Sequence, residues 1–304
     1  MMSAELQAWH DAGEFVETSL GHRVYCRQLG DAGAAPERTL LLLHGFPESS
    51  YSYHKVIEPL AAAFERVVVF DMIGYGLSDK PVDGYTYSLF EQADTALQVW
   101  RSLGVRGGHL LSHDMGDSVA TELVTREVSG LLPARFDGGF SSYTFTNGSM
   151  VLELAELRVT QKLLISAVGP ALSKLFNRRT FNQQVRSAQG TDRLDDSDLD
   201  LMWENILHNG GRTRNHLLAR YTLERRRFEK SRWLPSLART KLPVHLCWGE
   251  ADAVARVAMA DYLKAEVCTD ATVTKMPGVG HFCQISDPAI WVESVLGFYQ
   301  QLSA

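Results

Sequence analysis

The amino-acid sequence predicts an α/β protein, with a mostly parallel central sheet flanked by helices and an inserted helical cap. Two observations carry this prediction. Short apolar runs recur along the 304 residues, each bounded by Gly, Pro, Asp or His. Between them, apolar residues recur at every third or fourth position, as they do on one face of a helix. Runs that are apolar throughout are typical of buried parallel strands, and their alternation with helices is typical of βαβ units.

The expected elements follow one another in a simple order. Residues 14–18 and 23–29 flank a turn-forming segment and predict an antiparallel hairpin at one edge of the sheet. The remaining expected strands are residues 39–43, 67–70, 109–111, 244–248 and 272–276. The expected core helices are residues 53–64, 89–100, 119–124, 254–265 and 291–302.

The alternation of strands and helices stops near residue 141 and resumes near residue 242. The interval is rich in charged residues and helix formers, particularly at residues 152–165 and 194–207. Its length is within the usual range for a domain. We therefore expect a helical cap at residues 141–235, inserted between a first part of the core at residues 1–140 and a second part at residues 236–304.

The charge balance excludes some classes of partner. Lys and Arg number 30 against 36 Asp and Glu, a net charge of −6. Without a concentrated basic stripe, neither nucleic acid nor an anionic membrane surface is an expected partner. The run Arg225-Arg226-Arg227 is interpreted as a solvated helix face. No apolar stretch has the length of a membrane span, and the N-terminal residues do not resemble a signal peptide.

The cysteine pattern indicates a reducing compartment. The four cysteines lack the paired spacing of a zinc site, and they fit reduced thiols better than a disulfide framework. We therefore expect a cytoplasmic protein that binds neither a metal nor a cofactor. The sequence leaves the oligomeric state open. The cysteines are Cys26, Cys247, Cys268 and Cys283.

The most informative segment is LLSHDMGD, residues 110–117, where an expected strand meets an expected helix. Small residues, Ser112 and Gly116, lie two positions before and two positions after Asp114. This is the spacing of a nucleophile elbow, with Asp in the place that Ser has in other such turns. The N-terminus of the next helix would stabilise the carboxylate. The plainer alternative is that Asp114 only caps that helix.

A second loop follows the expected strand at residues 39–43. In His44-Gly45-Phe46-Pro47, the backbone can turn an N–H group toward the elbow. Phe46 and Met115 are therefore the expected N–H donors of an oxyanion hole. A simple Gly-Pro turn is the alternative, and the sequence does not decide whether Pro47 follows a cis bond.

Two residues near the C-terminus complete a possible catalytic triad. Asp252 lies just after the expected strand at residues 244–248, and His281 lies in the loop after the strand at residues 272–276. With Asp114, they give the chain order nucleophile, acid, base. A single Asp or His in such a loop is usually a surface residue, but matching segments in this order favour a catalytic site.

On these motifs the chain resembles the α/β-hydrolase superfamily over nearly its whole length, most weakly in the cap. HGFP, DMIGYGLSDKP and SHDMG are similar to a branch that contains haloalkane dehalogenases, epoxide hydrolases and animal mesoderm-specific transcript proteins. LLLHGFPESSY and LLSHDMGD are most similar to the last of these. The resemblance implies attack by Asp114 on an sp³ carbon, followed by hydrolysis of the resulting ester by water that His281 activates. Asp252 would orient His281.

The leaving group separates two chemistries within this branch. The resemblance to haloalkane dehalogenases implies Trp after the nucleophile and, in many of them, Asn in the HGxP-like loop, where this chain has Met115 and Phe46. Fluoroacetate dehalogenases would carry Arg after the nucleophile. Epoxide hydrolases usually present two cap tyrosines, and between residues 144 and 261 this chain has Tyr221 alone. Tyr221 is the candidate proton donor.

A second proton donor would be Tyr143, His208, His216 or a water. The side chains expected to line the substrate pocket are His113, Tyr143, Trp203, His208 and Phe282. Asn147, where some relatives carry the triad acid, is interpreted as a turn residue.

Asp117 is unusual because a small residue is common at that position. It is expected to contact the first helical turn or nearby polar groups.

The sequence therefore predicts a cofactor-independent hydrolase with a small neutral organic substrate, most favourably an epoxide that it opens to a diol. A haloalkane dehalogenase is the second hypothesis. A ligand-binding module on a hydrolase scaffold, with little turnover, is the alternative from another class.

Overall fold

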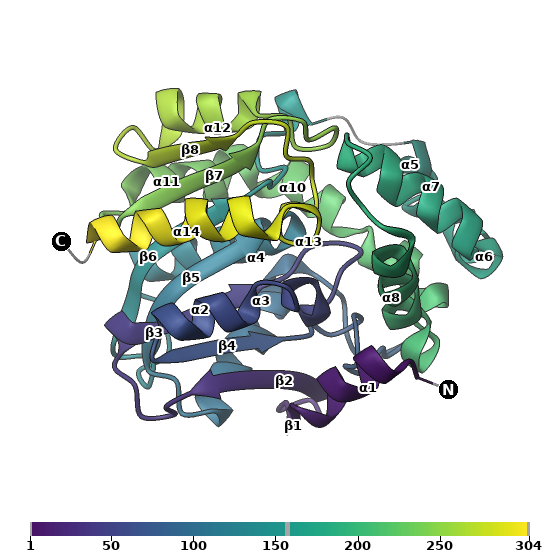
Figure 1. The fold of residues 1–304 in the computed structure, drawn as a ribbon, viewed down its shortest axis with the longest axis horizontal. Helices are drawn as coiled ribbons and strands as arrows, with labels where there is room; N and C mark the ends of the chain where they lie inside the picture. Colours follow the sequence, from purple (N-terminus) through teal and green to yellow (C-terminus); the bar gives the residue numbers. More distant parts are fainter. Residues whose placement is uncertain (1, 156–158, 303–304) are drawn as a thin grey trace.

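The central sheet determines where every loop of the candidate site lies. A computed structural model describes residues 2–155 and 159–302. Its eight strands have the order β1-β2-β4-β3-β5-β6-β7-β8 (Figure 1). β1 (Glu14–Glu17) and β2 (Arg23–Gly30) pair antiparallel at one edge, and β2 is also antiparallel to β4. The pairs from β4 to β8 are parallel, so the predicted fold class is confirmed.

The six parallel strands place their carboxyl ends at one edge of the sheet. Every residue of β3 and β4 is buried, as their continuous apolar sequences predict. The strands are β3 (Thr39–Leu43), β4 (Arg66–Phe70), β5 (Gly107–His113), β6 (Gly139–Thr146), β7 (Val244–Gly249) and β8 (Thr272–Met276). The loops after β3, β5, β6, β7 and β8 carry the candidate site residues.

Strand β6 departs from the expected boundary. Residues 141–146, which we expected to open the cap, belong to this strand and pair with β5 and β7. Its sequence, GFSSYTFT, mixes hydroxyl and aromatic residues and lacks the continuous apolar run that marked its neighbours. The cap that we propose as an inserted unit therefore begins after Thr146.

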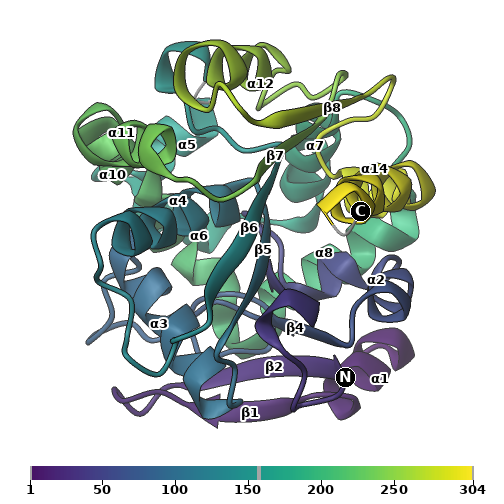
Figure 2. The ribbon, with the colours of Figure 1, turned by 90° about the vertical axis from the view of Figure 1, so that its left-hand side faces the viewer.

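Helices cover both faces of the sheet (Figure 2). On one face, α1, α2 and α14 pack in a cluster with Leu40, Leu42 and Trp291. On the other face, α3, α4, α11 and α12 pack in a cluster with Leu41 and Phe145. The helices are α1 (Ala4–Asp11), α2 (Ile57–Ala63), α3 (Leu89–Ser102), α4 (Met115–Val128), α11 (Leu234–Arg239), α12 (Ala258–Tyr262) and α14 (Pro288–Leu302), with the short α13 (Cys283–Ser286) before the last.

The cap segment is helical and lies beyond one end of the sheet, at the right of Figure 1. Its apolar core includes Phe181, Val185 and Leu199. The helices are α5 (Val159–Leu164), α6 (Gly169–Leu175), α7 (Arg178–Gln189), α8 (Asp196–Leu207), α9 (Asn215–Leu218) and α10 (Tyr221–Phe228). Part of the expected segment 152–165 lies outside the described residues.

The arginine run on α10 does not form one solvated face. Arg226 and Arg227 are exposed as predicted, but Arg225 is buried. Successive residues on a helix point in different directions, so one member of a charged run can face the interior.

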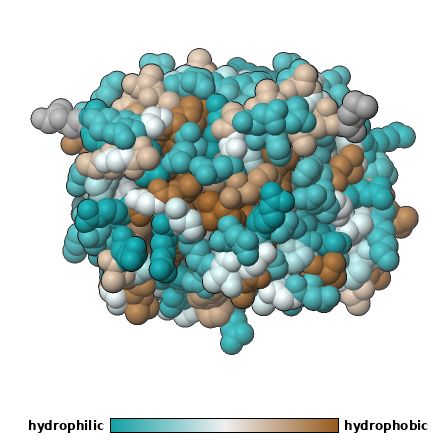
Figure 3. Space-filling model, turned by 90° about the horizontal axis from the view of Figure 1, so that it is seen from below, coloured by the Kyte–Doolittle hydropathy of each residue, from teal (hydrophilic) through white to brown (hydrophobic). Residues whose placement is uncertain are grey.

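The edge strand β1 faces solvent. In Figure 3 the molecule is seen from below, and hydrophilic residues cover most of this face, with apolar residues gathered near its centre. Glu14 and Glu17 at the ends of β1 are exposed, and charges on an edge strand oppose pairing with another chain. No helix among residues 2–155 and 159–302 is long and apolar enough to cross a membrane.

Trp291 provides a test of the packing between α14 and the sheet. Its side chain is fully buried, and its ring lies 6.2 Å from that of Tyr53. Trp291→Ala should lower the free energy of unfolding by about 3–5 kcal/mol through cavity formation, as measured by urea titration. The matched control is Ile290→Ala on the same helix, where the side chain is 39% exposed and the expected change is within about 0.5 kcal/mol. Equal losses would contradict this packing.

Candidate active site

Asp114 lies in a sharp turn between the end of β5 and the start of α4. Its backbone has φ 48° and ψ −110°, and its side chain makes no capping hydrogen bond to the helix. Such a conformation is costly for a residue with a side chain and is concentrated at functional sites. The geometry is that of an elbow, as predicted, and differs from the plainer helix-cap alternative.

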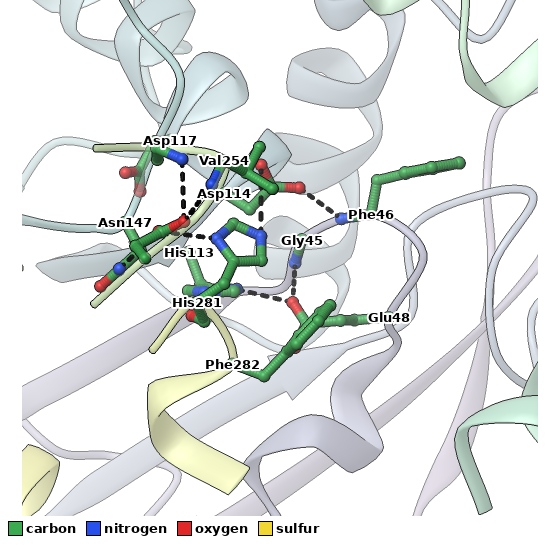
Figure 4. Close-up of polar contacts among 12 residues, drawn as sticks. Gly45, Phe46, Glu48, His113, Asp114, Asp117, Asn147, Val254, His281 and Phe282 are labelled. Carbon is green, nitrogen blue, oxygen red and sulfur yellow. Dashed lines mark hydrogen bonds and ion pairs between the residues drawn. The ribbon is translucent and has the colours of Figure 1, made fainter. Parts of the chain in front are cut away.

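Small residues allow the elbow to pack against the loop after β3. A Cβ atom on Gly116 would lie 2.6 Å from the carbonyl oxygen of His44, and one on Gly45 would lie 2.7 Å from Cβ of Asp114. Both distances are too short for any side chain. Across this contact, the Phe46 N–H donates a hydrogen bond of 3.0 Å to Oδ2 of Asp114 (Figure 4).

The two expected oxyanion donors are both next to Asp114. Phe46 makes the contact just described, and the bond between Phe46 and Pro47 is cis. Met115 is the first residue of α4, so its N–H belongs to the helix terminus, where backbone donors have no partner within the helix. The structure thus brings both N–H groups to the elbow, and their role in catalysis is a proposal.

His281 and Asp252 converge on the same edge of the sheet. Nδ1 of His281 lies 2.8 Å from Oδ2 of Asp252, and Oδ1 of Asp252 accepts hydrogen bonds from the N–H groups of Val254, at 2.6 Å, and Ala255, at 2.9 Å. These contacts fix the carboxylate, which in turn orients the imidazole ring. Nε2 of His281 points toward Asp114 and lies 3.9 Å from its Oδ1.

Asn147 also belongs to this cluster, a role that our interpretation of it as a turn residue did not include. Its side chain is fully buried; Nδ2 donates to Oδ2 of Asp252 at 2.6 Å, and Oδ1 accepts from the N–H of Gly249 at 3.2 Å. Its φ of 53° does suit a turn. The signal in the sequence was its place directly after β6, at the same edge of the sheet as the other site residues.

Opposing influences set the pKa of His281. Burial lowers this pKa, whereas the charge and hydrogen bond of Asp252, together with the charge of Asp114, raise it. The net result is a pKa above the ordinary value of 6.5. A base with a raised pKa accepts a proton from water more readily.

A buried ion pair lies beneath the His281 loop. Nδ1 of His113 is 2.6 Å from Oε2 of Glu48, and Nε2 of His113 donates to the carbonyl oxygen of His281 at 2.9 Å. Glu48 also accepts from the Gly45 N–H, at 3.0 Å, and from Nε2 of Gln284, at 2.8 Å. This network, shown in part in Figure 4, connects the loop after β3, the end of β5 and the loop after β8.

Each partner of this pair favours the charged form of the other. Burial lowers the pKa of His113, but the charge of Glu48 and hydrogen bonds with Cys283 and Glu48 together raise it to well above the ordinary value. Burial raises the pKa of Glu48, but the charge and hydrogen bond of His113, together with the charges of His281 and His44, lower it to below its ordinary value. We expected His113 to line the pocket. It lies beneath the site instead, because its ring points toward Glu48 and the backbone of His281.

A cavity of about 70 Å³ lies between the core loops and the cap helices. Among the described lining side chains, the titratable ones are Asp114, His281 and Tyr221. The others are apolar or carry neutral amide or hydroxyl groups. The lining residues are Phe46, Pro47, Asp114, Thr160, Gln161, Leu164, Phe176, Phe181, Gln184, Val185, Ala188, Asn215, Tyr221, Val254, His281 and Phe282.

Phe282 lines this cavity as expected, and so does Tyr221, the candidate proton donor, but His113 and three other expected pocket residues do not. Tyr143 lies in β6, where its hydroxyl contacts Glu127, so the alternation of the strand directs it away from the cap. Trp203 packs against Phe181 in the core of the cap, with ring centroids 5.4 Å apart. His208 follows α8 and is half-buried outside the cavity.

Asp117 is a buried carboxyl group beside the elbow. Burial raises its pKa to about 8, although the Ser112 hydroxyl, at 2.6 Å from Oδ1, lowers it. Among the described residues, Oδ2 has no hydrogen-bond partner, and a Cβ atom on Gly148 would collide with it. Asp117 thus contacts nearby polar groups, as expected.

Comparison with known proteins gives the family. The family described as alpha/beta hydrolase fold matches residues 38–288. The chain is an α/β-hydrolase. The match includes the elbow, the loop after β3 and both residues of the His281–Asp252 pair.

Two relatives of this α/β-hydrolase are similar over almost its whole length. LipZ of Mycobacterium tuberculosis, named as a hydrolase, is 35% identical over 297 residues, which cover 97% of this chain and 98% of LipZ. The human mesoderm-specific transcript homolog protein is 33% identical over 306 residues, which cover 98% of this chain and 88% of the relative. The predicted resemblance to mesoderm-specific transcript proteins is confirmed.

Solved structures share the fold of this hydrolase. A loop variant of haloalkane dehalogenase DbeA from Bradyrhizobium elkanii has a TM-score of 0.75 at 20% identity, covering 96% of this chain and 98% of that chain. A variant of a protein described as an epoxide hydrolase from Pseudomonas aeruginosa has a TM-score of 0.73 at 20% identity, covering 95% of each chain. At these identities the likeness shows the fold.

Replacing Glu48 should change how stability depends on pH. In the wild type, the stabilisation from His113 is present below its unfolded pKa of about 6.5 and is lost as the pH rises through its raised folded pKa. The stabilisation from Glu48 is lost only as the pH falls through its lowered folded pKa. In Glu48→Gln, His113 is buried without a charged partner and stays neutral in the folded state. Below pH 6.5 the unfolded state binds a proton on this histidine and the folded state does not, so the stability of the variant falls as the pH falls.

The measurement is urea unfolding at pH 5 and pH 8. The Glu48→Gln variant should lose about 3 kcal/mol relative to the wild type at pH 5, and less at pH 8. The matched control is Glu58→Gln, whose side chain is 72% exposed and which should change little at either pH. An equal loss from Glu48→Gln at both pH values would show that the Glu48–His113 pair is not ionised.

Proposed function

We propose that this α/β-hydrolase opens epoxides to diols through a covalent ester on Asp114. The observation that carries the proposal is the position of Tyr221, a phenol that lines the same cavity as Asp114 and His281 but reaches it from the cap. An epoxide oxygen leaves as an alkoxide and needs a proton, and a phenol opposite a carboxylate nucleophile supplies one. The arrangement provides a nucleophile, a base and an acid around one space.

The first step is ring opening. An Oδ atom of Asp114 forms a bond to one ring carbon, the bond from that carbon to the ring oxygen breaks, and its electron pair stays on the oxygen. Tyr221 gives its proton to that oxygen. Covalent catalysis of this kind divides one difficult hydrolysis into two easier steps. Attack by a carboxylate on an acyl carbon would give an anhydride, so the Asp nucleophile disfavours ordinary esters and amides as substrates.

The second step hydrolyses the ester. Water adds hydroxide to the carbonyl carbon of Asp114 and gives its other proton to His281, whose imidazolium Asp252 stabilises. The N–H groups of Phe46 and Met115 hold the developing oxyanion. Collapse expels the second diol oxygen, which takes the proton from His281. The Phe46 N–H already contacts this carboxyl group, at 3.0 Å, and supports the assignment.

The cavity favours a small neutral substrate. Its apolar wall includes Phe176, Phe181 and Val185, and its other polar groups are neutral amides and hydroxyls such as those of Gln184 and Asn215. Apart from Asp114 and His281, which the reaction itself uses, the lining offers no charged side chain among the described residues, so a charged group on the substrate would lose its hydration with little compensation. No tryptophan is among the described residues that line the cavity, which disfavours a halide site of the usual indole type.

Trapping the ester tests this proposal. His281→Gln removes the base of the second step but not the nucleophile, so incubation with an aryl or alkyl epoxide should leave the intact protein heavier by the mass of the epoxide, with the adduct on Asp114. His10→Gln, a surface histidine, is the control and should accumulate no adduct. An adduct from bromoalkanes alone would indicate a dehalogenase, and no adduct from either electrophile would indicate a ligand-binding module.

Removing the phenol should slow only the step that needs a proton. Tyr221→Phe in the His281→Gln background should slow ester formation from an epoxide by about 10²–10⁴-fold, as followed by rapid-quench mass spectrometry. The control is Tyr143→Phe, a buried tyrosine outside the cavity, which should change the rate little. If both variants react at the parent rate, Tyr221 is not the acid.

A further inference from the structure

Arg225 is a buried cation next to the elbow. The side chain is 4% exposed, although its neighbours Arg226 and Arg227 face solvent. Burying a guanidinium without partners is costly, so its contacts indicate what the position requires. The assigned nucleophile, base, acid and oxyanion donors leave this residue without a role.

Two hydrogen bonds fix the guanidinium against the core. Nε donates to Oγ of Ser118 at 2.6 Å, and Nη2 donates to the carbonyl oxygen of Asp114 at 3.3 Å. Ser118 lies in the first turns of α4, so both acceptors belong to the elbow and the helix that follows it. Arg225 thus connects the cap helix α10 to the backbone of the nucleophile.

The same guanidinium lies over the ring of Tyr221. Its Cζ is 4.6 Å from the ring centroid, and the two residues are one helical turn apart on α10. A cation over an aromatic face is attracted by the ring, and more strongly when both are shielded from water. Phe46 also packs near this phenol, with ring centroids 5.9 Å apart.

The charges around Tyr221 act in opposite directions. Burial raises the pKa of its phenol, and the charge of Asp114 raises it further. The charge of Arg225 lowers this pKa, as do hydrogen bonds with Gln161 and Arg225. Tyr75, a buried neutral phenol, is the other titratable group that interacts with it. The net pKa of this phenol stays above its ordinary value, and the charge of Arg225 offsets part of the rise that burial and Asp114 cause.

A lone ring-opening phenol must carry the developing negative charge by itself. Among the described lining residues, Tyr221 is the one tyrosine, and Tyr143 is directed away from the cavity. Two phenols would divide this charge between two hydrogen bonds. Here the compensation has to come from another group in contact with Tyr221.

We propose that Arg225 is this group: a positioning residue that holds the Tyr221 ring and stabilises the tyrosinate formed when Tyr221 protonates the epoxide oxygen. This inference rests on the proposed function. In the ring-opening step the proton moves from Tyr221 to the ring oxygen, and the negative charge moves to the phenolate beneath the guanidinium. After ester hydrolysis, Asp114 is first released as a carboxylic acid, and its proton returns to Tyr221 through solvent.

The test replaces Tyr221 with 3,5-difluorotyrosine, a more acidic phenol, and follows its titration by ¹⁹F NMR. Arg225→Gln should raise the titration midpoint by at least about one pH unit, a tenfold change in the ionisation constant. Arg225→Lys, which keeps the charge, should have a midpoint close to that of the parent protein. The matched control is the exposed neighbour, Arg226→Gln, which should leave the midpoint unchanged.

The kinetic arm uses unlabelled protein in the His281→Gln background. Arg225→Gln should slow ester formation from an epoxide at least tenfold, and Arg226→Gln should change it less than twofold. Should the Gln variant fail to fold, Arg225→Met fills the same space without charge and takes its place. An unchanged midpoint in a folded, uncharged variant overturns the inference.

The two arms separate this inference from the proposed function. If the parent protein forms no ester but the midpoint moves, the epoxide mechanism fails and the coupling between Arg225 and Tyr221 stands. If ester forms and neither the midpoint nor the rate depends on Arg225, the mechanism stands and the role of Arg225 is overturned. A slower rate with an unchanged midpoint would assign Arg225 to support of the elbow backbone alone.

Discussion

The close packing of the elbow against the loop after β3 is the constraint on which the site depends. Asp114 has a positive φ, and the chain can turn there because Gly116 meets the carbonyl oxygen of His44 with no side chain between them. That contact brings the Phe46 N–H to the Asp114 carboxylate. Parallel pairing of β3, β5, β6, β7 and β8 then brings the remaining loops to the same edge, where the three residues of the triad converge.

The site has charged side chains behind the cavity wall, and the wall itself is mostly apolar. The pair of Glu48 and His113 lies below the cavity, and Arg225 lies beside the elbow, whereas the cavity wall itself is mostly apolar. Charges placed behind the wall hold backbone atoms of the His281 loop and of Asp114 without exposing an ion to the substrate. Electrostatic interactions in such a water-poor site are strong because little solvent screens them.

Patterns along the chain were sufficient for much of the fold and for the central site residues. Apolar runs mark β3 and β4, and the elbow spacing marks Asp114, because both signals are local. Strand β6 was assigned to the cap because its sequence lacks a continuous apolar run. The buried amide of Asn147 and the pair formed by Glu48 with His113 depend on residues that are distant in sequence and meet only through the sheet. Which arginine of a charged run faces inward depends likewise on how α10 docks.

The contact between Asp117 and Gly148 has a consequence for the history of the family. The carboxyl group of Asp117, in the first turn of α4, occupies the volume that any side chain at position 148, after β6, would need. A lineage that enlarged residue 148 would first have to shrink residue 117, and a lineage that acquired an acid at 117 could do so only on a background of glycine at 148. Substitutions at these two positions should therefore occur together, in a fixed order, across related sequences.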